Sequence, residues 1–174
     1  MSRIDYDLTA IQGIVFDVDG VLSPSTISMD NDGVPLRMVN IKDGYALQLA
    51  VKSGLKIAII TGADTPSITK RYNALGITSV YLKSSDKLPV LRHWMEENGL
   101  NAHQVAYVGD DIPDLPAMCE AGLRVAPADA AVEVRMAATL ITKALGGYGV
   151  ARELLEEILK AQAKWMQDTQ AFGW

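Results

Sequence analysis

Three features of this 174-residue sequence predict an α/β fold. Short apolar runs at 14–16, 56–60 and 105–108 are typical of buried strands, and polar or turn residues follow each run. Segments with helical spacing of apolar residues lie between the runs. Strands that alternate with helices predict a parallel sheet covered on both faces, which is a three-layer, Rossmann-like architecture. A polar segment with its own turn signal adds a protruding β-hairpin at 23–39.

The composition indicates one packed globular domain spanning 1–174, since 49% of the residues are hydrophobic. The net charge of -5 predicts no basic face and therefore no nucleic-acid partner. Cys119 is the single cysteine, so an internal disulfide is excluded and a reducing compartment fits. The polar, acidic N-terminus is unlike a signal peptide, and no apolar run approaches the roughly 20 residues of a membrane helix. We therefore expect a cytoplasmic protein without a membrane partner.

The first strand, within 11–16, leads directly into two acidic residues, Asp17 and Asp19. The two-residue period of a strand places both carboxylates on the same side. If the strand belongs to a parallel sheet, both emerge at its carboxyl end, where open α/β sheets bind their ligands. Two carboxylates held this close repel each other, so a cation, a proton or a cationic ligand is needed to stabilise them.

The next segment has the pattern of a hairpin. Ile27 and Met29 alternate with polar residues, and the turn signal at 31–33 separates them from Leu36 and Met38. Pro35 favours an edge or protruding position over a central one, because proline cannot donate to a sheet ladder. A disordered loop is the alternative.

The remaining chain alternates helices with short strands as far as a long amphipathic helix near the C-terminus. Thr65 followed by Pro66 predicts a capped helix start, and glycines mark several helix ends. The expected elements are helix 41–51, strand 56–60, helix 65–76, strand 80–82, helix 88–98, strand 105–108, helix 115–122, strand 123–126, helix 131–136, strand 140–141, the flexible loop 146–149 and helix 150–167.

Polar groups follow several of these strands, and each taken alone has an ordinary structural explanation as a turn, cap or surface residue. Because parallel strands end at one edge of a sheet, we expect these groups to lie together. They are Asp17 with Asp19, Thr61, Lys87 just before a helix, and Asp110 with Asp111 and Asp114.

These residue types suit phosphoryl transfer. Asp17 and Asp110, with a backbone carbonyl, form an all-oxygen ligand set suited to Mg²⁺. A carboxylate can attack phosphorus, and a second acid two residues later can protonate the leaving oxygen and then deprotonate water. The hydroxyl of Thr61 and the ammonium group of Lys87 can stabilise the charge on the phosphoryl oxygens.

At this point the sequence resembles the haloacid dehalogenase-like phosphatases. Four motifs occur in order, namely 17–22 (DVDGVL), Thr61-Gly62, Lys87 and 109–114 (GDDIPD). The resemblance implies Asp17 as nucleophile and Asp19 as general acid and base, with Thr61, Gly62 and Lys87 binding phosphate. It also implies that Asp17, the Asp19 carbonyl and Asp110 bind magnesium, with Asp111 and Asp114 in supporting roles.

Within that family the chain is similar to the small branch that has no cap domain and acts on 3-deoxy-D-manno-octulosonate 8-phosphate. The similarity rests on 39–45, the short hairpin, 146–149 with Arg152-Glu153, and the terminal 171–174. It implies hydrolysis of this phosphorylated sugar acid in lipopolysaccharide sugar biosynthesis. It further implies a homotetramer in which neighbouring subunits cover the active sites, an arrangement that would exclude water.

One residue departs from this branch. Ala63 stands where relatives can carry a long charged residue that touches the sugar acid, so a nonulosonate 9-phosphate is the alternative substrate. Lys42, Asp43 and Arg152 are candidates for contacts with the substrate carboxylate or a neighbouring subunit, and ordinary caps and surface pairs explain them equally well. A non-catalytic assembly module and a receiver-type phospho-acceptor domain are the alternative function classes.

Overall fold

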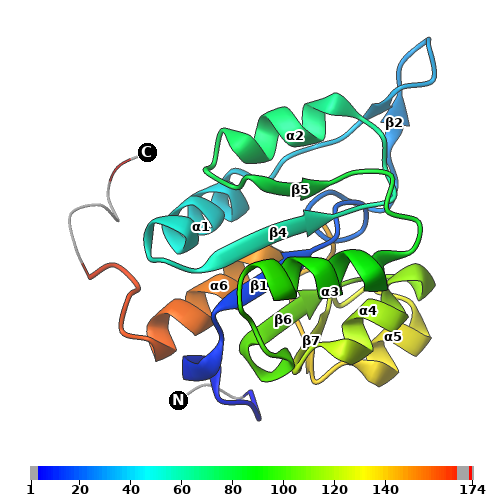
Figure 1. The fold of residues 1–174 in the computed structure, drawn as a ribbon. Helices are drawn as coiled ribbons and strands as arrows, with labels where there is room; N and C mark the ends of the chain where they lie inside the picture. Colours follow the sequence, from blue (N-terminus) through cyan, green and yellow to red (C-terminus); the bar gives the residue numbers. More distant parts are fainter. Residues whose placement is uncertain (1–3, 168–172, 174) are drawn as a thin grey trace.

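The computed structural model describes residues 4–167 and 173, and its centre is a six-stranded parallel sheet with strand order β5-β4-β1-β6-β7-β8 (Figure 1). Its strands are β1 (Gly13–Phe16), β4 (Lys56–Ile60), β5 (Ser79–Tyr81), β6 (Val105–Val108), β7 (Leu123–Ala126) and β8 (Leu140–Ile141). β1 lies between β4 and β6. The chain therefore adds β4 and β5 on one side of β1 first, and then β6, β7 and β8 on the other side. The gap between two such sides is where α/β sheets bind ligands.

Helices cover both faces of the sheet, as the alternating sequence pattern predicts. The helices are α1 (Ile41–Lys52), α2 (Pro66–Asn73), α3 (Lys87–Glu97), α4 (Leu115–Glu120), α5 (Val132–Ala137) and α6 (Val150–Ala161), with short 3-10 turns at Leu8–Ala10, Ala102–Gln104 and Ile112–Asp114. Residues of α1, α2 and α6 share one apolar cluster, and residues of α3, α4 and α5 share a second one. The three-layer prediction is therefore confirmed.

The central strand β1 is fully buried because it contributes to both clusters. Ile14 and Phe16 pack into the cluster of α1 and α6, whereas Val15 packs into that of α3 and α4. This alternation follows from the two-residue period of a strand. Burial on both faces explains the continuous apolar sequence of β1 and holds Asp17, the next residue, at the sheet edge.

The predicted hairpin is present and stands clear of the sheet. Its strands β2 (Ser28–Met29) and β3 (Pro35–Leu36) pair antiparallel around a turn in which Gly33 has a φ of 77°. In Figure 1 the hairpin projects beyond α2 and the ends of β4 and β5. Within the part of the chain that the structure describes, no cap domain stands over the sheet, because the chain returns from the hairpin directly into α1.

The last helix is shorter than predicted. It ends at Ala161 instead of 167, because Ala163 takes a left-handed φ of 54° and the side chain of Gln162 donates hydrogen bonds to the carbonyls of Leu8 and Ile11. The terminal segment 171–174, apart from Gly173, lies outside the described residues. Among the helices that the structure describes, none has the length and apolar character to cross a membrane.

Candidate active site

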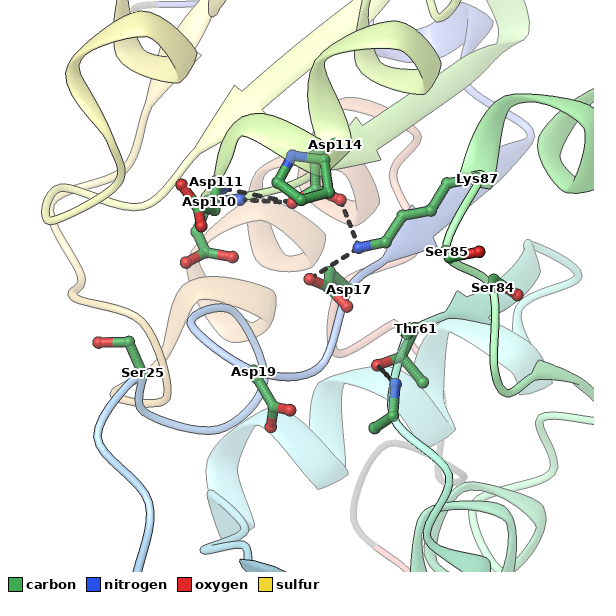
Figure 2. A pocket seen from close by; sticks show the side chains of 13 residues that line it. Asp17, Asp19, Ser25, Thr61, Ser84, Ser85, Lys87, Asp110, Asp111 and Asp114 are labelled. Carbon is green, nitrogen blue, oxygen red and sulfur yellow. Dashed lines mark hydrogen bonds and ion pairs between the residues drawn. The ribbon is translucent and has the colours of Figure 1, made fainter.

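The strand ends bring the sequence-predicted polar groups into one open pocket of about 470 Å³ (Figure 2). Asp17 and Asp19 follow β1, Thr61 follows β4, and Asp110 follows β6. The complete lining is Asp17, Asp19, Ser25, Thr61, Gly62, Ala63, Ser84, Ser85, Lys87, Asp110, Asp111, Pro113 and Asp114. The pocket therefore lies at the carboxyl edge of the central strands, as the parallel sheet predicts.

The loop after β1 orients Asp17. Its backbone N–H donates to the carbonyl of Val108, which continues the ladder to β6 by one residue, and its Oδ1 accepts from the N–H of Val18 at 2.7 Å. Gly20 then turns the chain with a φ of 84°, and a Cβ at this position would collide with the Asp110 carboxylate. Glycine is needed here for its conformation and for the close approach.

Lys87, the first residue of α3, connects two acidic groups of the pocket. Its Nζ lies 2.9 Å from Oδ2 of Asp17 and 2.7 Å from Oδ1 of Asp114, and its side chain is buried. Burial opposes the charge of Lys87, but Asp17 and Asp114 outweigh burial and raise the pKa of Lys87 above its usual value. Lys87 therefore stays charged and neutralises part of the acidic site.

Asp114 is an organising carboxylate with four hydrogen-bond donors around it. Its Oδ1 accepts from Lys87 and from the hydroxyl of the fully buried Tyr107 at 2.9 Å. Its Oδ2 accepts from the backbone N–H groups of Asp110 and Asp111 at 3.0 and 3.3 Å. Asp114 thus fixes the loop that carries Asp110 toward the pocket.

The acidic cluster suits a divalent cation. Carboxylate oxygens of Asp17, Asp110 and Asp114 all lie within 4.8 Å of one another, with no ammonium group beyond Lys87 in the pocket lining. Burial and then the charge of the neighbouring carboxylates raise the pKa of Asp17 to about 6 and that of Asp110 to about 8. The part of both pKa shifts that comes from neighbouring carboxylates reflects the excess negative charge of the cluster. An all-oxygen site of this kind fits Mg²⁺.

The loops after β4 and β5 form the opposite wall. The hydroxyl of Thr61 accepts from the N–H of Ala63 at 3.2 Å, and the carbonyl of Thr61 accepts from the N–H of Ser84. These contacts hold Thr61, Gly62 and Ser84 around the pocket mouth. The small Ala63 also lines the pocket and adds no charge to it.

Asp19 lies in the pocket but turns its carboxylate away from Asp17 and Lys87 (Figure 2). Both its oxygens accept from Arg37, from Nε at 2.6 Å and from Nη2 at 2.8 Å. Nη1 of Arg37 donates to the hydroxyl of Thr65 at 2.9 Å. Thr65 stands at the N-cap position of α2 before Pro66, as predicted, but its side chain makes no capping hydrogen bond to the helix.

The candidates Lys42, Asp43 and Arg152 lie outside the pocket lining. Asp43 is only 2% exposed, and its Oδ1 accepts from the backbone N–H of Arg152 at 2.6 Å, so a residue of α1 caps the start of α6. The Arg152 side chain pairs with Glu156 and stacks over Tyr45 and Trp165. Lys42 is exposed on the first turn of α1.

Sequence reasoning missed several residues that shape this site. They are Arg37, Tyr107 and the lining serines Ser25, Ser84 and Ser85. Tyr107 lies inside a strand that reads as purely apolar, and Arg37 comes from the hairpin, far from any motif. A hydroxyl inside a buried strand needs a hydrogen-bond partner, so the sequence indicated that Tyr107 contacts a polar group. Arg37 carried none, because its contact with Asp19 depends on how the hairpin folds back.

Comparison with known proteins agrees with this geometry. A family model described as haloacid dehalogenase-like hydrolase matches residues 75–154. The 3-deoxy-D-manno-octulosonate 8-phosphate phosphatase KdsC of Yersinia pestis is 40% identical over 154 residues, which cover 88% of this chain and 82% of the relative.

Solved structures give the same relationship. The crystal structure of the Yersinia pestis phosphatase superposes with a TM-score of 0.88 at 39% identity, covering 91% of this chain and 85% of that one. The Moraxella catarrhalis 3-deoxy-D-manno-octulosonate 8-phosphate phosphatase, solved with a magnesium ion, a phosphate ion and a KDO molecule, gives 0.90 at 34% identity and covers 96% of each chain. With the four motifs gathered in one pocket, these matches show that the chain belongs to the haloacid dehalogenase-like hydrolases, in the family of the KdsC phosphatases.

Proposed function

We propose that this protein hydrolyses 3-deoxy-D-manno-octulosonate 8-phosphate to the free sugar acid and phosphate. The observation that carries this proposal is the placement of Asp17 at the end of β1, beside Lys87 and within the cluster that contains Asp110. A carboxylate that can act as the nucleophile, a fixed cation and an acidic set suited to a metal ion lie around one open pocket, which supports the proposal. The relatives named for this substrate support the choice of sugar acid.

The residues divide the reaction into two displacements. Asp17 attacks phosphorus, the bond from phosphorus to the sugar oxygen breaks, and Asp19 gives that oxygen a proton. Asp19 then takes a proton from water, whose oxygen attacks the aspartyl-phosphate and releases phosphate and Asp17. Thr61, the Gly62 backbone and Lys87 hold the phosphoryl oxygens during both steps.

Asp17, Asp110 and the Asp19 backbone carbonyl would hold Mg²⁺, with Asp111 and Asp114 supporting the site. When bound, the ion offsets charge on the carboxylates and phosphoryl oxygens. Phosphate release should be measured over a panel of sugar phosphates, with Mg²⁺ and with a chelator. We expect the octulosonate 8-phosphate to be the best substrate and the chelator to stop turnover. Faster release from a nonulosonate 9-phosphate would change the substrate assignment.

The nucleophile can be tested separately from the substrate. Asp17→Asn should lower kcat by at least about 1000-fold, because an amide cannot form the aspartyl-phosphate. Asp32→Asn, at the exposed tip of the hairpin, is the matched control and should keep full activity. Full activity in the Asp17 variant would contradict the proposal, and so would stable phosphorylation of the wild-type protein without turnover.

The same proposal includes a cytoplasmic homotetramer in which neighbouring subunits cover the active site. Apolar side chains on and beside the hairpin are exposed, and they are Met29, Val34, Leu36, Met38, Val39 and Ile41. Exposed apolar groups gathered in one segment favour a subunit interface. Leu36→Glu should dissociate the assembly in light scattering and raise KM, whereas Met136→Glu, exposed on α5, should do neither. A wild-type monomer with full activity would contradict the assembly.

A further inference from the structure

Asp114 lies close enough to the proposed metal site to become a third carboxylate ligand. One of its oxygens lies within 4.8 Å of an oxygen of Asp17 and an oxygen of Asp110. Two bonds between calcium and oxygen, of about 2.3–2.6 Å each, can span a separation of this size. The contacts of Asp114 therefore decide whether an ion in the pocket meets two carboxylates or three.

Four hydrogen-bond donors surround the Asp114 carboxylate. Its Oδ1 accepts from Nζ of Lys87 at 2.7 Å and from the hydroxyl of Tyr107 at 2.9 Å. Its Oδ2 accepts from the backbone N–H groups of Asp110 and Asp111, at 3.0 and 3.3 Å (Figure 2). An ionised carboxylate has about four acceptor sites. With the contacts that the described residues make, Asp114 is saturated and has no acceptor site to offer an ion.

Tyr107 is the neutral side chain among these donors, and the fold holds it in place. It lies in β6, which pairs with β1 on one side and β7 on the other. Its fully buried ring belongs to the apolar cluster of α3, α4 and α5, so the hydroxyl has a fixed position. Removing that hydroxyl ends the saturation of Asp114 without changing the net charge of the site.

Magnesium and calcium differ in how many carboxylates suit them. Mg²⁺ keeps several waters and is usually bound through one or two carboxylates, whereas Ca²⁺ takes about six to eight oxygens in a flexible arrangement. A site with Asp17 and Asp110 as its carboxylates therefore favours Mg²⁺. Adding Asp114 as a third carboxylate improves the site for Ca²⁺.

We infer that Tyr107 is a positioning residue that selects Mg²⁺ over Ca²⁺, because it keeps Asp114 saturated and out of contact with the ion. Without the hydroxyl, Oδ1 of Asp114 keeps Lys87 as its donor and has one acceptor site open. A buried acceptor that has lost its donor is costly, so the carboxylate turns toward the ion. This inference rests on the proposed function, because it requires the metal site of that reaction.

The test measures metal binding directly, by calorimetric titration of metal-free protein with Mg²⁺ and with Ca²⁺. Tyr107→Phe should raise the affinity for Ca²⁺ relative to that for Mg²⁺ by about 10- to 100-fold, the range over which residues behind a metal ligand act. Crystals grown with Ca²⁺ should show an Asp114 oxygen at about 2.3–2.6 Å from the ion in the variant, and no such contact in the wild type.

Tyr6→Phe is the matched control. It removes a tyrosine hydroxyl that donates to the carbonyl of His103 at 2.7 Å, and neither residue lines the pocket. The ratio of the two affinities should stay at its wild-type value in this control. Circular dichroism should first show that each variant is folded.

Several results would overturn the inference. If Tyr107→Phe weakens the binding of both ions by the same factor, the hydroxyl only stabilises the site, and an unchanged ratio contradicts the inference as well. An Asp114 oxygen bound to the ion in wild-type crystals overturns it even if the variant does not fold. A wild type that binds neither ion removes the metal site and the inference together. A wild type that binds Mg²⁺ but releases no phosphate contradicts the proposed hydrolysis and leaves the metal selection by Tyr107 standing.

Discussion

Lys87 and Asp114 form a buried ion pair, with Nζ and Oδ1 2.7 Å apart, that joins the start of α3 to the loop after β6. Asp17 shares the same ammonium group at 2.9 Å. Lys87 therefore connects the two halves of the sheet at the pocket, and the stability of the site and its proposed chemistry depend on the same contact.

Lys87→Met should cost both stability and activity. Removing one partner from a buried ion pair leaves the other charge uncompensated, at a cost of about 3–5 kcal/mol in the free energy of unfolding. We also expect kcat to fall by at least about 100-fold, because the phosphoryl oxygens lose a fixed cation. Urea unfolding and phosphate release measure the two effects. Lys83→Met is the control, since Lys83 pairs with Asp64 at an exposed position, and a loss as large there would contradict the argument.

Tyr107→Phe removes a donor without emptying the core. The Tyr107 hydroxyl donates to Asp114 at 2.9 Å from a fully buried position. A hydrogen bond to a charged group contributes about 1.5–3 kcal/mol, so the free energy of unfolding of the variant should fall by about that amount. The midpoint of its urea unfolding should fall accordingly. Tyr148→Phe, at an exposed ring in the loop before α6, should shift the midpoint little. Equal midpoints for wild type and Tyr107→Phe would show that the hydroxyl does not support Asp114.

The acidic cluster predicts a pH-dependent response to magnesium. Burial and neighbouring carboxylates raise the pKa of Asp17 to about 6 and that of Asp110 to about 8, above the ordinary 3.8. The folded, metal-free protein thus binds protons more tightly than the unfolded chain. The stability that these groups contribute is complete below their ordinary pKa and is lost as the pH rises through about 6 and about 8.

Mg²⁺ competes with those protons, so its stabilising effect should grow with pH. We expect the difference in Tm between protein with Mg²⁺ and protein with a chelator to widen from about pH 5 to about pH 9. Asp110→Asn should flatten this dependence, because the carboxylate with the highest pKa is gone. A Tm difference that stays constant over this range would argue against the cluster as the metal site.

Asp43 should act on stability through α6. Asp43→Ala removes the acceptor for the Arg152 N–H and should destabilise the fold by about 1–2 kcal/mol, the range of a lost helix cap. Lys42→Ala, at the exposed neighbouring position, should change the free energy of unfolding by less than about 0.5 kcal/mol. A higher KM with unchanged stability in Asp43→Ala would instead support a contact with substrate.

The fold was largely predictable because its signals are local. Buried strands such as β1 and β6 are continuous apolar runs. The Asn40 side chain caps the start of α1, and Gly33 tolerates the positive φ that its turn requires. The end of α6 was not predictable in this way. Its sequence continues to favour a helix, and the contacts of Gln162 with Leu8 and Ile11, more than 150 residues away, accompany its end.

By itself, the sequence determined the residue types and their order: carboxylates, a hydroxyl and an ammonium group after successive parallel strands, which the topology must gather at one edge. The tertiary structure alone decided which group meets which. It placed Lys87 between Asp17 and Asp114, assigned Asp43 to the start of α6, and closed Asp19 onto Arg37 from the hairpin. Such pairings depend on loops and crossovers that set distances in space, and no spacing along the chain encodes them.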